Sequence, residues 1–388
     1  MRILHLTTLL QGGAGRAIAD LACAQQRAGH WVDVVTSATA PEGYGNYPAY
    51  LEQLRETGVD LHLVDSMFSR ELPANLHVVR HILDRDLLAG TTVVHAHAAT
   101  PALVALMAKG ASGRRVPVVE TMHGWGLRKN LAQQRADVAI MDIVERLVVP
   151  ASSSADVLRA AGVSRAEIAV VAYGVGEALS STPKDDVHAM VDGLRQQQRT
   201  VFCCVGTIGD RKNQMAIVEA IACMADPARV ACLIVGDGDP SALLARADTL
   251  GVGHAVHVLG YRTDAPSIAR AADWYLLPSR SEGQPLSILE AYRDGVPVMA
   301  SRIPELAELV HDDETGLLFD QEAPADLARR MSDAVRMTHA AREAQLGRAR
   351  RRFETTFTLQ AMVHGYAAEY AHARAALHAA GTTTGAAA

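Results

Sequence analysis

The sequence predicts an α/β protein with two doubly wound parallel-sheet domains, and three observations lead to this prediction. Short apolar and β-branched runs alternate with stretches of helical composition along most of the chain. This alternation is typical of strand–helix–strand units whose helices cover both faces of a sheet. It is interrupted once, between Gly174 and Arg199. The length of 388 residues is too great for one ordinary domain and suits two.

The first series of strands is expected to form an N-terminal domain over residues 1–175. Helical composition separates several of its apolar runs, for example at Arg16–Ala28 and Ala102–Lys109. Runs of this length, rich in Val, Ile and Leu, are typical of strands buried on both faces. The expected strands are Arg2–Leu6, Trp31–Thr36, Thr92–His95, Val116–Thr121, Leu147–Val149 and Ile168–Val171.

A second domain is expected after the interruption. Residues 176–198 are polar and contain Pro and several turn formers, so we expect a linker whose later part is a short helix. Residues 199–352 form the second domain and residues 353–376 form terminal helices, whereas residues 377–388 have nothing to bury and are expected to be disordered. The expected strands of the second domain are Thr200–Val205, Val230–Val235, Val256–Leu259, Trp274–Leu277 and Val296–Ala300.

Composition excludes several classes of function. Hydrophobic residues make up 49% and charged residues 21%, which is typical of a globular protein. The formal net charge of -6 argues against general binding of nucleic acid. The five cysteines have no CxxC spacing, which favours a reducing, cytoplasmic compartment. The apolar run at the N-terminus is short and reads as a buried strand, and no run approaches the roughly 18 apolar residues of a membrane span.

The segment with the clearest chemistry is PSRSEGQPLSILEAYRDGVPVMASRIPELAELVHDDETGLLF. Pro285 suits the first turn of a helix because its missing N–H would be unpaired there. Glu282 then lies in the preceding loop, and Glu290 lies inside the helix. The free N–H groups near Gln284–Ser287 form an anion site at the positive end of the helix dipole. An ordinary amphipathic helix with a solvent-facing Glu290 is the alternative.

This segment resembles the nucleotide-sugar domain of the retaining GT-B glycosyltransferases, specifically family 4. The Glu-x7-Glu spacing, the flanking SEGQPLSILEA and the later GVPVMAS, PE and TGLLF all match. The resemblance implies the GT-B fold, in which two Rossmann-like domains face each other across a cleft. It also implies that Glu282 is a catalytic residue on the donor sugar and that Glu290 holds the ribose. The neighbouring residues implied in donor binding are Gln284, Pro285, Leu286 and Ser287.

A second segment, VFCCVGTIGDRKNQMAIVEA, combines a strand that ends at Gly206 with a polar loop and a helix that starts near Asn213. Arg211 and Lys212 are placed to neutralise a diphosphate at the start of that helix, although such a pair is also common on solvated surfaces. The resemblance implies that Lys212 clamps the donor phosphates. Many relatives carry Arg directly after the strand glycine, where this chain has Thr207, and Arg211 is the candidate to supply that charge.

Three glycines, Gly12, Gly13 and Gly15, follow the first strand in the sequence QGGAGR. Glycine lets a backbone approach phosphate oxygens closely. The spacing fits neither GxGxxG nor the P-loop, so a structural turn explains these residues equally well on their own. The resemblance implies a glycine-rich loop that approaches the diphosphate from the N-terminal domain.

Histidines follow two strands of the first domain. By resemblance His123, in TMHGW, faces the donor sugar, where it would bond a hydroxyl and help to hold oxocarbenium-like charge; a structural histidine is the alternative. His95 and His97 share one strand face and could suggest a metal. No third ligand with suitable spacing is visible, and the GT-B scaffold needs no metal. We therefore expect structural or cleft roles for this pair, with His97 the better cleft candidate.

Three further positions are interpreted through the resemblance. Tyr261 and Arg262 follow the strand HVLG, where the backbone of relatives meets the nucleobase. Tyr173 stands before Gly174 where relatives usually have Asn-Gly. The terminal helices resemble those that cross back to the first domain, so truncation before Phe353 should reduce stability.

The expected activity is transfer of a sugar from a nucleotide-diphosphate sugar to a hydroxyl, with retention and without a metal or other cofactor. A glycan, a lipid-linked sugar and a small molecule are all open as acceptors, and by family habit the expected role is cell-envelope polysaccharide or glycolipid assembly. UDP and GDP sugars are both open as donors, with ADP less favoured. Arg70, Arg80 and Arg85 lie near a helical stretch that could contact an anionic membrane surface peripherally or form a solvated basic face.

Two other functions fit the same scaffold. A nucleotide-sugar 2-epimerase would produce an epimer with no acceptor present, and the extended match around Glu282 favours transfer over epimerisation. A catalytically idle scaffold would bind a nucleotide sugar or a partner enzyme without reaction. The joint presence of His123, Lys212, Glu282 and Glu290 speaks against that second alternative.

Overall fold

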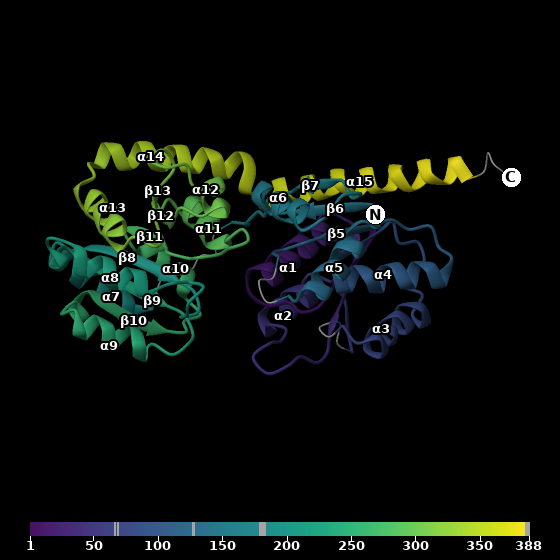
Figure 1. The fold of residues 1–388 in the computed structure, drawn as a ribbon, viewed down its shortest axis with the longest axis horizontal. Helices are drawn as coiled ribbons and strands as arrows, with labels where there is room; N and C mark the ends of the chain where they lie inside the picture. The colour runs from purple at the N-terminus through teal and green to yellow at the C-terminus, as the bar shows by residue number, and fades with distance from the viewer. Residues whose placement is uncertain (66, 68–69, 126–128, 178–183, 385–388) are drawn as a thin grey trace. The chain divides into compact units, whose positions relative to one another are not determined.

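The computed structural model describes residues 1–65, 67, 70–125, 129–177 and 184–384, and it divides the chain into two α/β units (Figure 1). The first unit comprises Met1–Gly176 and the chain from Thr358 onward, and the second comprises Glu177–Phe357. Each unit contains one sheet of parallel strands. The predicted fold class, two doubly wound parallel-sheet domains, is confirmed.

The sheet of the first unit has the strand order β3-β2-β1-β4-β5-β6-β7 among the described residues. The order reverses between β1 and β4, which are paired from Ile3 to Thr7. Both strands are buried because helices cover both faces of the sheet, as their apolar composition requires. The strand bounds are β1 Arg2–Thr7, β2 Trp31–Ser37, β3 Asp60–Val64, β4 Val93–His97, β5 Val118–Thr121, β6 Arg146–Val149 and β7 Ile168–Val170.

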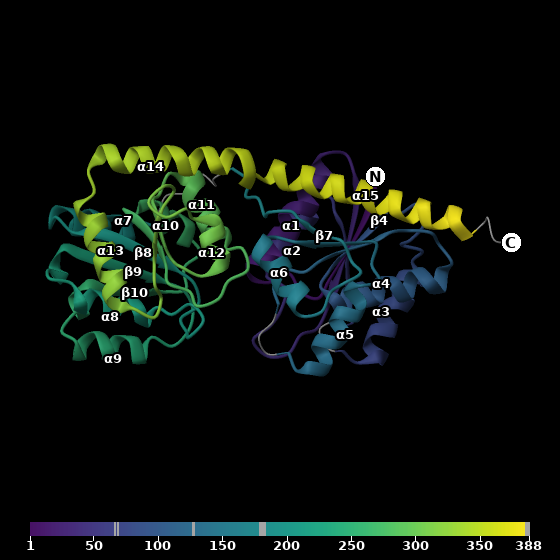
Figure 2. The same ribbon diagram turned by 45° about the horizontal axis from the view of Figure 1, so that its top comes forward.

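Two groups of helices cover this sheet (Figures 1 and 2). The helices α3, α4, α5 and α6 enclose a large core with the sheet, and α1 and α2 enclose a second core with β2. The C-terminal helix α15 contacts α1, β5 and β6. The helix bounds are α1 Gly12–Arg27, α2 Pro48–Glu56, α3 Leu72–Asp84, α4 Ala99–Ser112, α5 Leu131–Met141, α6 Ser152–Ala160 and α15 Leu359–Thr384.

The sheet of the second unit has the strand order β10-β9-β8-β11-β12-β13 among the described residues. Its order reverses between β8 and β11. On one face α8, α9 and α13 form the main core, and on the other α7 and α10 form a smaller one. The strand bounds are β8 Thr200–Val205, β9 Val230–Val235, β10 Val256–Gly260, β11 Trp274–Leu277, β12 Val298–Ser301 and β13 Leu317–Phe319. The helix bounds are α7 Asp185–Gln196, α8 Met215–Cys223, α9 Ser241–Thr249, α10 Ala265–Ala271, α11 Leu286–Asp294, α12 Pro304–Leu309, α13 Pro324–Arg336 and α14 His339–Arg352.

Two strands, β3 and β13, were not predicted from the sequence. β3 lies at the edge of its sheet and its first four residues are not fully buried, so DLHLV lacks the continuous apolar run that marked the other strands. β13 is an edge strand of three residues, Leu317–Phe319, within TGLLF. Edge and very short strands give the weakest hydrophobic signal because they are covered on fewer sides.

The boundaries of the second unit differ from the expected linker and tail. Val187, Val191 and Leu194 of α7 pack against Val201 and Cys203 of β8, so this helix is part of the second unit and not a free linker. Residues 178–183 lie outside the described residues. At the other end, Phe353–Phe357 form a π-helix that ends the second unit, and α15 begins at Leu359.

The C-terminal helix is a structural part of the first unit. Met362, Tyr366, Tyr370 and Ala373 on α15 are almost completely buried. The helix continues to Thr384, beyond the point at which disorder was expected, and residues 385–388 lie outside the description. Gly174 permits the return of the chain, since a Cβ atom there would lie 2.1 Å from the carbonyl oxygen of Thr358.

The predictions of a reducing compartment and of no membrane-spanning segment depend on the cysteines and on the apolar length of the helices. Cys23, Cys203, Cys204 and Cys232 are buried free thiols, and Cys223 is exposed. Burial raises the pKa of the Cys204 thiol to about 12, which makes it unreactive. Within the described ranges, none of the helices combines the length and apolar character needed to cross a bilayer.

Candidate active site

Most of the predicted site residues lie near the two points where the strand order reverses. In doubly wound sheets, ligands bind beyond the carboxyl ends of the strands at these points. In the first unit, β1 leads to Gly12–Gly15 and β4 ends at His97. In the second unit, β8 leads to the Gly206–Lys212 loop and β11 leads to Glu282 and α11. Topology therefore places both halves of the prediction where a ligand is expected.

In the Gly206–Lys212 loop, the backbone of Gly206 lies close to the side chain of Lys212. A Cβ atom on Gly206 would lie 3.0 Å from Cε of Lys212, so glycine leaves room for the lysine side chain to fold back along the strand end. Gln214, which the sequence interpretation did not single out, braces this loop. Its amide nitrogen donates to the carbonyls of Gly206 and Thr207, and its amide oxygen accepts from Gly209 N–H.

Lys212 and its neighbour Arg211 form one ionic cluster with Glu282, which lies 70 residues after Lys212 in the sequence. Lys212 Nζ lies 2.7 Å from Oε1 of Glu282, and Arg211 Nη1 lies 3.1 Å from Oε2. The side chains of Lys212 and Glu282 are 14% and 7% exposed, whereas that of Arg211 is 58% exposed. Lys212 is thus held in a partly desolvated position, where an ion pair is stronger than at the surface. Thr207, where many relatives carry Arg, is exposed, and Arg211 is the cation that follows it in the same loop.

The start of α11 provides backbone donors beside this cluster. Pro285 is the N-cap of the helix and has no side chain able to accept from the free N–H groups of the first turn. Leu286 and Ser287 follow in that turn, and Gln284 is buried. Glu290 lies one turn further and lines a small hollow of about 40 Å³ together with Ser287. The predicted helix is therefore reproduced, with Glu282 in the loop before it and Glu290 on it.

Two residues that were predicted to bind the donor, Tyr261 and Arg262, do not lie beside the ionic cluster at the start of α11. Tyr261 follows β10 and is 74% exposed. Arg262 forms ion pairs with Asp264 and with Asp186 of α7, at 2.8 Å in each case. The hydrogen bonds that Arg262 donates to Asp264 lower the pKa of that carboxyl well below its ordinary value. Arg262 therefore fastens α7 to the loop after β10, a structural task that the sequence did not reveal.

The glycine-rich segment of the first unit is a helix start and not an open loop. α1 begins at Gly12, with Gln11 as its N-cap, so Gly13 and Gly15 are already helical. A Cβ atom on Gly15 would lie 2.4 Å from the carbonyl carbon of Leu10, which shows that this glycine serves helix–strand packing. The helix contains no acidic residue in its first turn. Its N–H groups can still face an anion, as expected, but from a helix terminus.

His123 is held by its neighbours through both ring nitrogens. Nε2 lies 3.0 Å from Nδ1 of His97, and Nδ1 is hydrogen-bonded to the hydroxyl of Tyr173. Burial lowers the pKa of His123 to about 4, so the ring is neutral at physiological pH. A hydrogen bond from a ring nitrogen to a sugar, as predicted from the resemblance, would require one of these bonds to break. Tyr173, which stands where relatives usually have Asn, therefore has a defined contact in this structure, its hydrogen bond to His123.

A hollow of about 340 Å³ opens beside these histidines. Its lining includes His97, His123, Gln11 and Arg70, all at the carboxyl edge of the first sheet. The guanidinium of Arg70 contacts buried Asp137, with Nη2 to Oδ2 at 2.8 Å. His97 is therefore a pocket residue, as expected, and Arg70 belongs to the same hollow and not to a membrane-facing helix.

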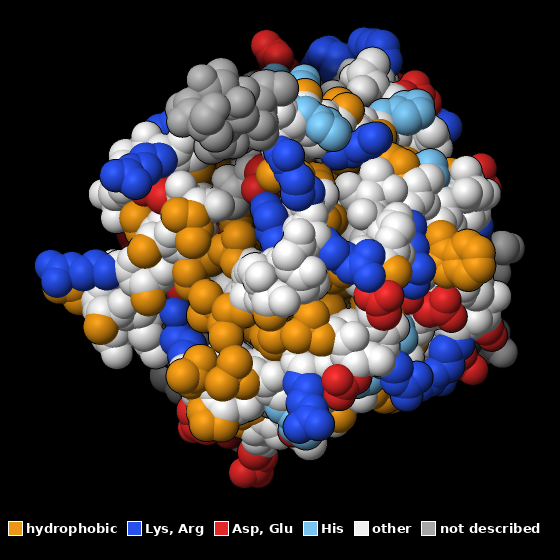
Figure 3. Space-filling view, turned by 90° about the vertical axis from the view of Figure 1, so that its right-hand side faces the viewer, with side chains coloured by type: hydrophobic (Ala, Val, Ile, Leu, Met, Phe, Trp, Pro, Cys, Tyr) orange, Lys and Arg blue, Asp and Glu red, His pale blue; other side chains and the backbone are white. Residues whose placement is uncertain are grey.

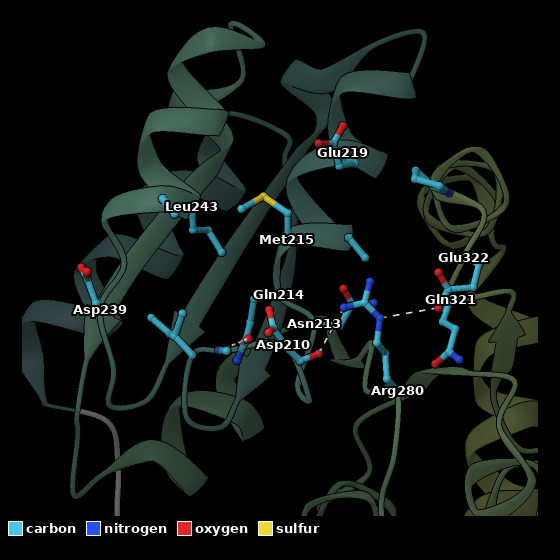
Figure 4. Close-up of a pocket in the computed structure, with 15 residues that line it drawn as sticks. Asp210, Asn213, Gln214, Met215, Glu219, Asp239, Leu243, Arg280, Gln321 and Glu322 are labelled. Atoms are coloured by element: carbon cyan, nitrogen blue, oxygen red, sulfur yellow. Dashed lines mark hydrogen bonds and ion pairs between the residues drawn. The ribbon is translucent and has the colours of Figure 1, made fainter.

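A second hollow, of about 390 Å³, lies in the second unit (Figure 4). Figure 4 shows Arg280 between the Asp210 loop and Glu322, with Nε 3.5 Å from the carboxylate of Glu322. Asn213, in a left-handed conformation, also lines it, and α8 begins two residues later than expected. The described lining residues include none of the predicted donor-binding residues, but Asp210 and Asn213 flank Arg211 and Lys212, so this hollow adjoins the loop of the ionic cluster.

His5 supplies the third nitrogen that the sequence interpretation did not find. It lies on β1 in register with His95, and His5, His95 and His97 bring nitrogen atoms within 4.8 Å of one another. A histidine inside the apolar run RILHLT was the available signal. An ion at this set would compete with the hydrogen bonds that these nitrogens already make.

Glu120, on β5 beside the site, is a fully buried carboxylic acid. Neither of its oxygens has a hydrogen-bond partner among the described residues. Burial, with a smaller contribution from Asp137, raises its pKa from 4.5 to about 8. The folded chain therefore keeps a proton on Glu120 between pH 4.5 and about 8, where the unfolded chain has lost it. The free energy of unfolding falls as the pH rises through this window.

Replacement of Glu120 by Gln should remove this dependence. The wild-type chain is expected to lose on the order of a few kcal/mol relative to Glu120→Gln between pH 5 and pH 8, because each pKa unit corresponds to about 1.4 kcal/mol. Urea unfolding of both proteins across this range measures the difference. Parallel pH profiles would show that Glu120 ionises normally in the folded chain.

Comparison with known proteins covers both units. The family model described as Glycosyltransferase Family 4 matches residues 11–178, and the model described as Glycosyl transferases group 1 matches residues 199–336. D-inositol 3-phosphate glycosyltransferase from Actinosynnema mirum is 29% identical over 89% of this chain and 90% of its own length. UDP-Gal:alpha-D-GlcNAc-diphosphoundecaprenol alpha-1,3-galactosyltransferase from Escherichia coli is 28% identical over 59% of this chain, and the match spans 62% of that relative.

Solved structures agree with the sequence relatives. HepE from Anabaena, crystallised with UDP and glucose, aligns with a TM-score of 0.78 at 19% identity, over 95% of this chain and 98% of that one. WaaG, a glycosyltransferase involved in lipopolysaccharide biosynthesis, aligns with a TM-score of 0.64 at 18% identity, over 92% and 95% of the two chains. With matching family models in both units and this shared fold, the chain belongs to the GT-B glycosyltransferases.

Proposed function

We propose that this enzyme transfers a sugar from a UDP-sugar to a hydroxyl acceptor with retention of anomeric configuration. The observation that carries the proposal is the cluster of Lys212, Arg211 and Glu282 beside the start of α11. Cations and free backbone N–H groups at one strand edge suit a diphosphate. UDP is favoured over GDP because the E. coli relative is named for UDP-Gal and HepE was crystallised with UDP.

In this proposal the second unit binds the donor. Lys212 and Arg211 turn from Glu282 toward the diphosphate, and the N–H groups of Leu286 and Ser287 bind its oxygens. Glu290 accepts hydrogen bonds from the ribose, and Glu282, released from part of its ion pairing, accepts from sugar hydroxyls. These contacts strengthen as negative charge grows on the departing diphosphate, which is electrostatic stabilisation of the transition state.

Retention follows if the acceptor attacks the face that the diphosphate leaves. The glycosidic C–O bond to the phosphate breaks, the acceptor oxygen forms the new bond to the anomeric carbon, and a phosphate oxygen takes the acceptor proton. No protein carboxylate is assigned as a nucleophile in this scheme, so no covalent glycosyl-enzyme is proposed.

The hollow beside His97, His123 and Arg70 is proposed to receive the acceptor. It is of small-ligand size, and Arg70 offers a cation already balanced by Asp137. The E. coli relative acts on a diphosphoundecaprenol-linked sugar, which supports a role in envelope polysaccharide or glycolipid assembly at the inner face of the membrane.

Peripheral membrane contact is part of the same proposal. On α3, Leu72 and Leu76 are 59% and 44% exposed, and Arg80 and Arg85 lie near its C-terminal end. Figure 3 shows one face of the molecule on which hydrophobic side chains gather with Lys and Arg beside them. Apolar and basic side chains together suit an anionic lipid surface.

Retention is tested by the configuration of the first product. A UDP-α-sugar, incubated with the enzyme and followed by proton NMR from the earliest times, should release the α-anomer before mutarotation mixes the two forms. Release of the β-anomer first would contradict retention. Conversion of the donor to its C2 epimer without acceptor would instead indicate the epimerase alternative, which the transferase relatives disfavour.

A further inference from the structure

A chain of hydrogen bonds runs from His123 away from the pocket and is buried at its far end. Nε2 of His123 meets Nδ1 of His97 at 3.0 Å, and Nε2 of His97 meets Nδ1 of His5 at 2.9 Å. Nε2 of His5 then meets the amide oxygen of Gln25 at 2.8 Å. At the other end, the hydroxyl of Tyr173 meets Nδ1 of His123. We call these five residues the histidine relay.

Each imidazole ring of the relay is neutral and carries a proton on only one of its two nitrogens. His5, His97 and Gln25 are between 0% and 4% exposed, so water cannot supply alternative partners. Burial lowers the pKa of His5 to about 4 and that of His97 well below its ordinary value. A neutral imidazole has one N–H donor and one acceptor nitrogen, so the role of one nitrogen fixes the role of the other.

Gln25 determines the direction of every bond in the relay. Its oxygen can only accept, so Nε2 of His5 donates and Nδ1 of His5 accepts. Nε2 of His97 must then donate to His5, and Nε2 of His123 must donate to His97. The last acceptor, Nδ1 of His123, receives the proton of Tyr173.

The amide of Gln25 is itself held in place. Its nitrogen donates to the hydroxyl of Tyr370 on α15 at 3.1 Å, and that hydroxyl lies 2.8 Å from Nδ1 of His95. A histidine or a hydroxyl exchanges donor and acceptor by moving one proton. An amide can exchange them only by rotating half a turn, and Gln25 is 2% exposed.

We propose that Gln25, acting through His5 and His97, fixes His123 in the tautomer with its proton on Nε2. Gln25 is thus a positioning residue for a ring that lines the candidate acceptor pocket. The relay keeps His123 neutral and fixed in orientation, so this ring presents no positive charge to the candidate acceptor pocket. That consequence rests on the proposed function, whereas the tautomer does not.

The same bonds argue against an ion among His5, His95 and His97. Both nitrogens of His5 and of His97 are used within the relay, and those of His95 face Tyr370 and Thr121 at 2.8 and 2.7 Å. A metal would have to replace several of these bonds at once. Metal binding is therefore an outcome that the test must be able to reveal.

Long-range proton–nitrogen NMR of the full chain, labelled with ¹⁵N-histidine, reads the tautomers directly. We expect His5, His97 and His123 in the wild-type protein to show Nε2–H at neutral pH. In Gln25→Met, which keeps the side-chain volume but removes the amide, His123 should change to a mixture of both tautomers. In Tyr173→Phe, the matched control at the other end, His123 should keep Nε2–H.

Any of four results would overturn the proposal. One is a His123 that carries its proton on Nδ1 in the wild-type protein. Another is an unchanged tautomer in folded Gln25→Met. The third is metal-bound nitrogen signals from His5 and His97, with stoichiometric metal in the purified protein. Should Gln25→Met not fold, the wild-type and Tyr173→Phe spectra still decide, since a tautomer that changes in Tyr173→Phe places control at the wrong end. No donor or activity enters this readout, so it is independent of the proposed transfer.

Discussion

Replacement of Lys212 by Ala is expected to lower the turnover number for sugar transfer by about 100- to 1000-fold, the range seen when one group that stabilises a transition-state anion is removed. The lysine is 14% exposed and lies 2.7 Å from Glu282, so it is ordered before the donor binds. Its loss would leave the departing diphosphate without its best-placed cation and would leave Glu282 with Arg211 alone. Initial rates under saturating donor measure the effect.

Two neighbouring arginines serve as controls for Lys212. Arg211→Ala should reduce turnover less, because that side chain is 58% exposed and its charge is more screened by solvent. Arg280→Ala should be close to wild type, because the guanidinium of Arg280 pairs with Glu322 and its bond to the loop of Lys212 through the backbone N–H is kept in the variant. A Lys212→Ala enzyme with near-normal turnover would remove the role assigned to this residue.

Deletion of the chain after Phe357 is expected to abolish stable folding of the first unit. This deletion removes α15 and its buried Met362, Tyr366 and Tyr370. Loss of one large aromatic side chain from a core costs about 3–5 kcal/mol, and whole domains are stable by only about 5–15 kcal/mol. It also removes the Tyr370 hydroxyl that holds Gln25.

Thermal and urea unfolding of the full and shortened chains test this expectation. Deletion of residues 378–388 is the matched control, because it retains the buried residues from Met362 to Ala373 and should leave the unfolding transition unchanged. A chain that ends at Phe357 and unfolds with the stability of the full protein would show that α15 is dispensable for the first unit.

The sequence was most informative where strands are buried on both faces. β8, β9 and β11 were predicted with the residues that the structure gives them, because each is a continuous apolar run with clear ends. β3 was missed because an edge strand needs no apolar face on its open side, and α7 was taken as part of a linker although its apolar residues cover β8.

The candidate site could be predicted only in part. Glu282 and Glu290 were placed correctly in the loop and on α11 by local patterns, and resemblance supplied their roles. The pairing of Lys212 with Glu282 depends on how the strand ends meet, which composition and spacing do not encode. The relay could not be foreseen, because its members lie on different strands and helices of the first unit, with His5 and His97 92 residues apart, and Gln25 belongs to no motif.

Ligand-observed NMR of the purified protein with UDP-, GDP- and ADP-sugars tests the central claim most directly. The account predicts that at least one nucleotide sugar, with UDP first, binds the wild-type enzyme and is slowly hydrolysed. It also predicts that Glu290→Ala weakens that binding, whereas Arg280→Ala does not. A folded wild-type protein that binds no nucleotide sugar in the panel, or one whose binding is unaffected by Glu290→Ala, would contradict the assignment of the donor site to the start of α11.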